Sequence, residues 1–356
     1  MRIAFFTPDL DSNSLGRTYC LWLLARELGW DARVYSTRGT HVWAPLTSDP
    51  FAKTCTLIDA SPTRAAPEPF LRDCDLVIAV KPLPTSLGVA HAWARELGKP
   101  MVADVDDPDV ESKTVWERPV RRLGRLLLQG GRQRDLRRMG RLARTLPSMV
   151  SSPVLGDIYG GVVIPHARHH EPFAGHRDGS GPLTVAFVGT PHAHKGIDLL
   201  RSAVDELSGE GFELVVTAAP PADARPWERW VGTTSLAEGA ALIAGADIVA
   251  LPSLLTPWSR GQLPAKLIDA MMAGKAVVAS DIGPIAWALA DTGHLFEPGD
   301  RAALVGAMRR LADSRYRTEL GARARARAVG TFSVAALAPR FEAVCRYAVD
   351  ALEAHV

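Results

Sequence analysis

The sequence predicts an α/β protein built from two doubly wound parallel-sheet domains. The chain has 356 residues, more than the roughly 250–300 residues at which a single hydrophobic core stops growing. In both halves, short apolar runs rich in Val and Ile alternate with longer helical stretches, which is typical of parallel sheets covered on both faces. Between the halves, residues 171–182 contain three glycines and two prolines, a composition that favours a loop over a helix.

The periodicity places the individual elements. In the first half we expect strands at 2–6, 32–36, 54–58, 75–80, 101–105 and 149–152, with helices at 15–28 and 87–97. In the second half we expect strands at 184–188, 213–217, 247–251 and 276–279, with helices at 197–207, 236–244, 263–273 and 302–312. The resulting domains are 1–170 and 183–332, joined by a linker at 171–182.

The last segment, 333–356, reads as one more helix. An apolar stripe at helical spacing supports this, formed by Leu337, Phe341, Val344, Ala348 and Leu352. Pro339 lies in the first turn or two, where a helix tolerates proline or bends. This helix either caps the second domain or crosses back onto the first.

Composition excludes several classes of protein. Hydrophobic residues make up 47% of the chain and charged residues 22%, which is ordinary for a globular protein and excludes a disordered one. No apolar run approaches the ~18–20 residues that span a bilayer, and the N-terminus lacks the pattern of a secretory signal. The cysteines, Cys20, Cys55, Cys74 and Cys345, form no CxxC pair, so we expect reduced thiols and a cytoplasmic location. The high Ala and Arg usage suggests a GC-rich bacterial genome.

The net charge of +2 conceals one strongly basic segment. Residues 118–144 carry ten arginines and a single acid, Asp135, so the segment has a charge of +9 and the remainder −7. A basic amphipathic helix can lie on an anionic membrane or attract an anionic acceptor; the alternative is a solvated helical face. Nucleic acid is not expected as a partner, because no aromatic residues are interleaved with the arginines.

Residues that could bind a ligand follow the expected strands. In open parallel sheets, ligands bind beyond the carboxyl ends of the strands. Gly16 and Arg17 open the first helix, whose exposed amides and dipole favour an anion. Gly189 follows the strand at 184–188, and Lys195 precedes the next helix, where a lysine can neutralise phosphate. An ordinary loop glycine and a surface Lys–Gly turn are the alternatives.

The stretch from 252 to 283 is the most informative. Its loop ends in Leu263-Pro264, and proline is favoured at the first helical position. Lys266 and Asp269 are three residues apart and share a helix face. An aspartate there can accept two ribose hydroxyls while the preceding backbone amides hold a diphosphate; alternatively Asp269 only balances the helix dipole.

Together these motifs resemble the GT-B glycosyltransferases, and among them the large retaining family 4. The resemblance covers nearly the whole chain. Its marks are the N-terminal strand–Gly–helix, Ile164-Pro165-His166-Ala167, Val188-Gly189 with Lys195-Gly196, Pro252-Ser253, and Lys266-Leu267-x-Asp269-Ala continuing to Gly274-x-x-Val-Val-Ala-Ser. The implied fold has two Rossmann-like domains facing a cleft.

The resemblance also implies roles for residues of the second domain. Lys195 binds the donor diphosphate, and Asp269 holds the nucleotide ribose. The family's usual arginine falls at Thr190 and its usual first acid at Gly261, so this chain departs from the pattern at both positions. Backbone amides of Gly261, Gln262 and Leu263 face the phosphates, and the nucleobase lies near Val231. His192, His194 or Arg260 are candidates for the missing positive charge.

In the first domain, the family usually has a histidine after the strand that ends at Val105. Asp106 and Asp107 stand there instead, where a side chain would meet the donor sugar or the acceptor. An Asp-x-Asp pattern is also a metal motif of another glycosyltransferase fold, but the Lys195 and Asp269 pattern indicates a diphosphate neutralised by side chains and helix ends. We therefore expect no metal and no cofactor.

These implications define a functional hypothesis. The protein moves a sugar from a nucleoside-diphosphate sugar to an acceptor hydroxyl, with retention of configuration. Charge develops on the β-phosphate as it leaves, and Lys195, the loop amides and Arg17 or Arg260 stabilise it. Two alternatives stay open: a nucleotide-sugar epimerase of the same fold, and a non-catalytic protein that binds a nucleotide sugar or a partner.

Overall fold

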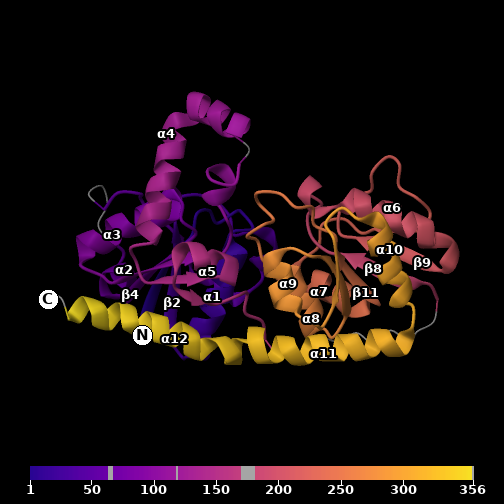
Figure 1. Ribbon diagram of the computed structural model, residues 1–356. Helices are drawn as coiled ribbons and strands as arrows, with labels where there is room; N and C mark the ends of the chain where they lie inside the picture. Colours follow the sequence, from indigo (N-terminus) through magenta and orange to yellow (C-terminus); the bar gives the residue numbers. More distant parts are fainter. Residues whose placement is uncertain (63–66, 118, 170–180, 355–356) are drawn as a thin grey trace. The chain divides into compact units, whose positions relative to one another are not determined.

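The computed structural model describes residues 1–62, 67–117, 119–169 and 181–354. The chain divides into two compact units. Unit 1 comprises Met1–Ala167 together with Val334–Val356, and unit 2 comprises Arg168–Ser333. Most of the linker expected at 171–182 lies outside the described residues. Figure 1 shows the chain coloured along its sequence.

Unit 1 contains a parallel sheet that, in the described part of the chain, has seven strands in the order β3-β2-β1-β4-β5-β6-β7. The strands are β1 (Arg2–Phe6), β2 (Asp31–Ser36), β3 (Cys55–Leu57), β4 (Leu76–Val80), β5 (Met101–Val105), β6 (Ser148–Val150) and β7 (Val162–Val163). Every pairing is parallel. The strand order reverses between β1 and β4, which is the topological switch point where ligands bind in this type of sheet.

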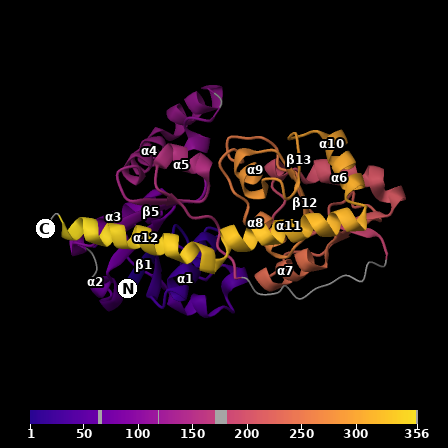
Figure 2. The same ribbon diagram turned by 60° about the horizontal axis from the view of Figure 1, so that its bottom comes forward.

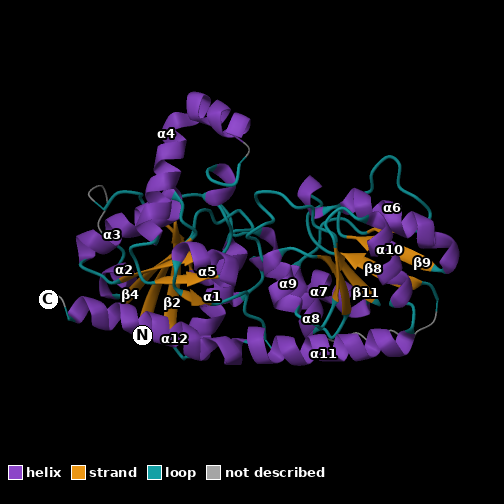
Figure 3. Ribbon diagram, in the orientation of Figure 1, coloured by secondary structure: helices purple, strands orange, loops and turns teal. Residues whose placement is uncertain are grey.

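The helices of unit 1 cover both faces of this sheet (Figure 3). They are α1 (Leu15–Glu27), α2 (Pro69–Asp73), α3 (Val89–Leu97), α4 (Pro119–Ala143), α5 (Pro153–Tyr159) and α12 (Val334–Glu353). Side chains of β1 alternate between two cores: Ile3 and Phe5 pack in one, Ala4 and Phe6 in the other. Both faces are apolar because successive strand residues point to opposite sides of a sheet that is covered twice.

Helix α12 belongs to unit 1 although it ends the sequence. It contacts α1 (Figure 2), and its buried Leu337, Phe341 and Val344 join the core that contains β1. The sequence left two placements open for this helix, and in the structure it packs on the first unit. Leu352, expected on the buried stripe, is 37% exposed, so that part of the stripe was wrong: the apolar contact ends about one turn earlier.

Unit 2 contains a second parallel sheet, for which the described residues give six strands in the order β10-β9-β8-β11-β12-β13. They are β8 (Leu183–Phe187), β9 (Phe212–Val216), β10 (Glu228–Trp230), β11 (Ile248–Leu251), β12 (Ala276–Ser280) and β13 (His294–Phe296). Its helices are α6 (Ile197–Leu207), α7 (Leu236–Gly245), α8 (Ala265–Met272), α9 (Gly283–Leu289), α10 (Arg301–Arg310) and α11 (Ser314–Phe332). The switch point lies between β8 and β11.

Short helices complete the described elements. They are 3₁₀ turns at Ala44–Leu46, Pro50–Thr54, Glu111–Lys113, Ala193–Lys195 and Ser208–Glu210, and one π turn at Pro84–Gly88. The π turn replaces the start of the helix expected at 87–97, which begins as α3 only at Val89. Pro264 precedes α8 as its N-cap rather than forming its first residue, since its ψ of 125° is extended.

Candidate functional site

Two loops meet at the switch point of the second sheet. The first follows β8 and ends at Gly196, the N-cap of α6; the second follows β11 and leads to α8. The amide of Leu254 donates to the carbonyl oxygen of His194 at 2.9 Å. Gly196 has a φ of +72°, and a side-chain carbon there would lie 1.8 Å from the carbonyl oxygen of Pro252. Only glycine therefore allows the two loops to approach this closely.

Lys195 reaches across from the first loop to the second. Its Nζ donates to Oε1 of Gln262 at 2.8 Å. Both side chains are only partly buried, so the ammonium lies at the edge of the crevice. The structure thus brings together two residues that the sequence assigns to donor binding.

Lys266 approaches the same crevice from α8. Its Nζ lies 4.6 Å from the centroid of the Phe187 ring, over the last residue of β8. A side-chain carbon at Gly189 would lie 2.7 Å from this Nζ, so the lysine packs against the glycine backbone. Burial and the positive charge of Lys195 lower the pKa of Lys266 to about 7, while Asp269 partly opposes that shift.

Asp269 lies one turn further along α8. Its carboxylate forms an ion pair with Nε of Arg168, and Nη2 of Arg168 lies 3.5 Å from Oδ2. Both side chains are about three-quarters buried. The expected ribose acceptor is therefore held in place by an arginine that the sequence analysis did not identify.

The loop before α8 is internally bonded. Ser259 is buried and its Oγ donates to the carbonyl oxygen of Leu254 at 2.6 Å. The amides of Gly261 and Gln262 donate to carbonyl oxygens within the turn at 3.4 and 3.3 Å, which is longer than the usual 2.7–3.2 Å. Both amides are thus only weakly bonded within the turn, and their contact with a phosphate stays a prediction. Leu263 is buried, and Arg260 is exposed.

Three further expected positions lie around this crevice. The amide of Gly189, at a φ of +111°, donates to Oγ1 of Thr217 at 2.6 Å. Thr190 is exposed. Val231 follows β10 and lines a cavity of about 660 Å³ beneath α7. None of the residues lining that cavity is a lysine, so it is separate from the crevice at the lysines.

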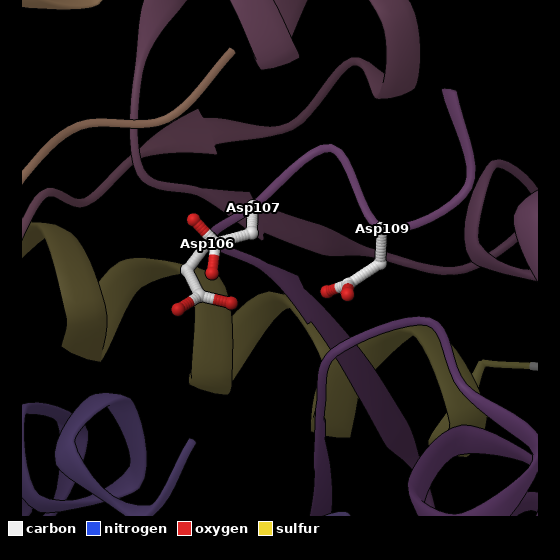
Figure 4. Close-up of side chains that lie close together, drawn as sticks. All are labelled: Asp106, Asp107 and Asp109. Atoms are coloured by element: carbon white, nitrogen blue, oxygen red, sulfur yellow. The ribbon is translucent and has the colours of Figure 1, made fainter. Parts of the chain in front are cut away.

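A second charged cluster occupies the switch point of the first sheet. Lys81 directly follows β4, and its Nζ lies 2.8 Å from Asp106, 2.7 Å from Asp107 and 3.2 Å from Asp109. One carboxylate oxygen from each aspartate lies within 4.8 Å of the others. Figure 4 shows the three side chains on the loop that follows β5, with their carboxylates turned toward the same space.

Burial governs the charges of this cluster. Lys81, Asp106 and Asp109 are each at most 7% exposed. Burial lowers the pKa of Lys81, but the three carboxylates outweigh it and raise that pKa well above its usual value. Burial raises the pKa of Asp106 and of Asp109, and Lys81 opposes both shifts. The ammonium of Lys81 thus lies among three carboxylates and partly compensates their charge.

Arg17 is enclosed in the same unit. Its Nη2 donates to Oδ1 of Asp104 at 2.5 Å, and its Nε to Oδ2 at 3.0 Å. Nη1 and Nη2 also donate to the carbonyl oxygens of Pro165 and Ile164 at 3.0 and 2.8 Å. With the guanidinium 2% exposed and bonded on several sides, the structure assigns Arg17 to holding the segment after β7 onto the sheet. This differs from the phosphate contact expected from sequence.

Comparisons with known proteins address the family and the fold. Residues 182–314 match the family model described as "Glycosyl transferases group 1". HepE of Anabaena, solved in complex with UDP, superposes with a TM-score of 0.74 at 16% identity, over 98% of this chain and 100% of that one. Sucrose-phosphate synthase from Thermosynechococcus elongatus gives a TM-score of 0.68 at 17% identity, over 99% and 100% of the two chains.

WaaG, a glycosyltransferase involved in lipopolysaccharide biosynthesis, gives a TM-score of 0.62 at 14% identity, over 96% and 98% of the chains. No curated protein matches the sequence. The chain therefore has the GT-B fold, and residues 182–314 match a glycosyltransferase family model. The expected α/β architecture of two Rossmann-like parallel-sheet domains is confirmed.

In this GT-B chain, the second unit contains most of the residues expected to bind the donor. Lys195, Gln262 and Asp269 lie around the β8–β11 switch point together with Gly189. Val231 lies apart, at the cavity under α7. Gly16 and Arg17 belong to unit 1, as do Asp106 and Asp107.

Sequence reasoning missed two charged residues, Lys81 and Arg168, and named Lys266 only as a neighbour of Asp269 on one helix face. Lys81 and Lys266 each carried a signal. Lys81 follows the fully apolar strand β4, and Lys266 sits in the first turn of α8, where a helix dipole disfavours a cation. Arg168 carried none, because its partner Asp269 is 101 residues away.

Proposed function

We propose that this glycosyltransferase transfers a sugar from a nucleoside-diphosphate sugar to an acceptor hydroxyl, with retention of the anomeric configuration. Unit 2 binds the donor, and unit 1 contributes Asp106 and Asp107 to the acceptor side. The observation that carries the proposal is that a cation, Lys195, and a carboxylate suited to a ribose, Asp269, both lie at one switch point, where Lys195 contacts Gln262 and Asp269 contacts Arg168. That pairing suits a nucleoside diphosphate.

A uridine nucleotide is the first donor to test. HepE, which shares the fold, has been solved with UDP and with UDP-glucose. In this chain the two loops at the β8–β11 switch point would hold the nucleotide. The identity of the sugar and the acceptor follows from the assay rather than from the fold, because one fold serves many substrates.

The proposed reaction needs no protein nucleophile. The bond between the anomeric carbon and the β-phosphate oxygen breaks, and the bonding electrons stay on the phosphate. Lys195 stabilises that charge as it develops. The acceptor oxygen bonds to the anomeric carbon on the face that the phosphate leaves, and the acceptor proton passes to the departing phosphate.

We propose that neither a metal nor a cofactor takes part. Lys81 already contacts Asp106, Asp107 and Asp109 at 2.7–3.2 Å, so an ammonium of the protein itself lies among these carboxylates. Activity in excess EDTA, compared with added Mg²⁺ or Mn²⁺, tests this part of the proposal.

The central experiment incubates the protein with a panel of UDP-, GDP- and ADP-sugars and separates the products by chromatography. We expect slow release of nucleoside diphosphate from one donor even without acceptor. Lys195→Ala should lower that rate by about 10²–10³-fold, the usual effect of removing one donor to a developing oxyanion. Lys275→Ala, at another partly buried lysine of unit 2, is the matched control and should keep the wild-type rate.

The two alternatives give different products. An isomerised sugar nucleotide would replace the transferase proposal with an epimerase. Binding of a sugar nucleotide with neither hydrolysis nor isomerisation would indicate a non-catalytic protein. A wild-type rate in Lys195→Ala would remove Lys195 from the reaction.

We also propose that α4 contacts an anionic membrane surface and that the protein is cytoplasmic. No helix in the described ranges has the length and apolarity to cross a bilayer, so the contact would be peripheral. Helix α4 projects from unit 1 (Figure 1) and kinks at Gln129, whose φ and ψ are −137° and 33°. Its exposed side chains include Arg132, Arg134 and Arg138, with Leu128 87% exposed beside them.

Vesicle sedimentation tests the membrane proposal. The protein should bind vesicles that contain an anionic lipid, should not bind neutral vesicles, and should be released by salt. Glutamine at Arg132, Arg134 and Arg138 should abolish the binding, whereas glutamine at the exposed Arg315 and Arg323 of α11 should not. Equal binding of both variants would contradict the membrane proposal and indicate that α4 is a solvated helix.

A further inference from the structure

Lys266 occupies a position that is unfavourable for a cation in three ways. It lies in the first turn of α8, where the helix dipole presents partial positive charge. It is partly buried, so the ammonium loses hydration. It also lies close enough to Lys195 for that charge to lower its pKa. Each of these costs would be relieved by an anion bound between the two lysines.

The nearby acid does not provide that relief. Asp269 opposes the pKa shift of Lys266 only partly, because its carboxylate is already paired with Arg168. When Lys266 is protonated, the charged side chains named here are three cations, Lys195, Lys266 and Arg168, and one carboxylate. The excess of about two positive charges in that protonation state matches the charge of a diphosphate bridge.

The position of the Lys266 side chain is also fixed by packing against the loop after β8. Its Nζ rests against Gly189, where a side-chain carbon would lie 2.7 Å away, and 4.6 Å from the Phe187 ring centroid. Thr190, the next residue of that loop, carries no charge and is exposed. The part of this loop around Gly189 therefore receives positive charge from Lys266 of α8, while Lys195 lies at the other end of the loop.

We propose that Lys266 is the second cation of the diphosphate site and binds the pyrophosphate of the donor together with Lys195. This inference rests on the proposed function, because it assigns one more residue to the same donor site. It also assigns Gly189 a role: the glycine leaves the space that Lys266 needs to reach the phosphates.

The proposal has a consequence for proton binding. A bound anion favours the charged form of Lys266 and raises its pKa from about 7 toward the ordinary value. Between these two pKa values the complex holds a proton that the unbound protein lacks. Nucleotide binding should therefore take up close to one proton near pH 8, and affinity should fall as pH rises through 7.5–9.5. The phosphates of UDP are already ionised in that window.

The experiment titrates UDP and UMP into four proteins by calorimetry: the wild type, Lys266→Met, Lys195→Ala and Lys275→Met. Lys266→Met keeps much of the side-chain volume and removes the charge. It should weaken UDP binding about 10–100-fold, as expected for a lost charged hydrogen bond, and should weaken UMP less. Lys275→Met, at a partly buried lysine whose pKa burial also lowers, should bind UDP like the wild type.

Two readouts separate binding from a structural role. In two buffers of different ionisation enthalpy at pH 8, the wild type should take up a proton on binding UDP, and Lys266→Met should not. Lys195→Ala should take up a smaller fraction of a proton, because loss of the Lys195 charge raises the pKa of Lys266 in the unbound protein. Without nucleotide, Lys266→Met should melt at the same temperature as the wild type or higher, because a disfavoured charge has been removed.

The outcomes are distinguishable. Wild-type affinity and proton uptake in Lys266→Met would overturn the inference while leaving the proposed function intact if Lys195→Ala loses affinity. A lower melting temperature in Lys266→Met with unchanged UDP affinity would assign the lysine to folding and also overturn it. Failure of the wild type to bind any nucleoside diphosphate would instead refute the proposed function.

Discussion

At the scale of single residues, Lys81 shows what a buried charge requires. Its φ of 68° is in the left-handed region, which costs a non-glycine residue roughly 1–2 kcal/mol. The amide of Lys81 donates to the carbonyl oxygen of Asp104 at 2.8 Å, and Oγ of Ser86 donates to the carbonyl oxygen of Lys81 at 2.8 Å. These bonds fix a strained backbone so that one ammonium reaches three carboxylates.

Replacing this cation should be costly. Lys81→Met leaves three largely buried carboxylates without their partner, and breaking a buried ion pair from one side typically costs about 3–5 kcal/mol. We expect a loss of that order in the free energy of unfolding, measured by urea denaturation. Lys53→Met, at an exposed lysine of the same unit, is the control and should be nearly neutral.

The same variant should change the pH dependence of stability. Burial raises the pKa of Asp106 and Asp109 while Lys81 opposes the rise, so removal of Lys81 raises both further. The folded state then binds more protons than the unfolded state, and stability falls as pH increases. Lys81→Met should therefore lose more stability relative to the wild type at pH 8 than at pH 5. An equal loss at both pH values would contradict this account of the cluster.

Some site residues could not be predicted from the sequence, because their interaction partners are far away along the chain. Lys195 and Asp269 were predictable because each follows a strand that ends at the switch point. Arg168, by contrast, belongs to the site only through its contact with Asp269, which is 101 residues away. Arg17 was placed correctly at the first helix, but its partner Asp104 is 87 residues away, and that distant carboxylate decides that Arg17 is structural.

At the scale of elements, prediction succeeded where a periodic apolar pattern decides the structure. Helix α6 spans 197–207 as predicted, and β1 and β5 also have the expected bounds. A strand that is buried on both faces is apolar throughout, so it can be recognised in the sequence as a short continuous apolar run. Boundaries elsewhere shifted by one or two residues, as with β8 and β9.

Elements without that pattern were missed. Helix α11 (Ser314–Phe332) is rich in arginine, and its buried positions are mostly small, such as Gly321, Ala324 and Ala328. Its close packing is visible at Gly321, where a side-chain carbon would lie 2.1 Å from the carbonyl oxygen of Gly274. Small residues carry little hydropathy signal, although they allow two backbones to approach. Strand β13, only three residues long, is too short to show a period.

At the scale of the whole molecule, the sequence order differs from the structural division. Unit 1 is completed by α12, the last helix of the chain, after the whole of unit 2 has intervened. The apolar stripe of α12 predicts a helix but cannot identify the surface that it covers, because any apolar groove satisfies it. That choice depends on side chains such as Trp30, whose ring centroid lies 5.8 Å from that of Phe341.

This division yields a prediction about where α12 acts. Phe341 is fully buried in the core of unit 1, and Phe341→Ala should cost about 3–5 kcal/mol of stability, as large-to-small changes in a core do. Hydrogen exchange should show the loss in β1, β4 and α1, which share that core, while β8 and β11 keep their protection. Tyr347→Ala, on the same helix but 65% exposed, should leave exchange in both units unchanged.

The UDP affinity of Phe341→Ala tests whether unit 2 stays intact when unit 1 is destabilised. Because the proposed donor site consists of unit 2 residues, Phe341→Ala should bind UDP with wild-type affinity under conditions where unit 1 is still folded. Loss of protection in β8 and β11, or weaker UDP binding at a temperature below the melting of unit 1, would mean that α12 supports unit 2 as well. The helix would then couple the stabilities of both units rather than complete the first alone.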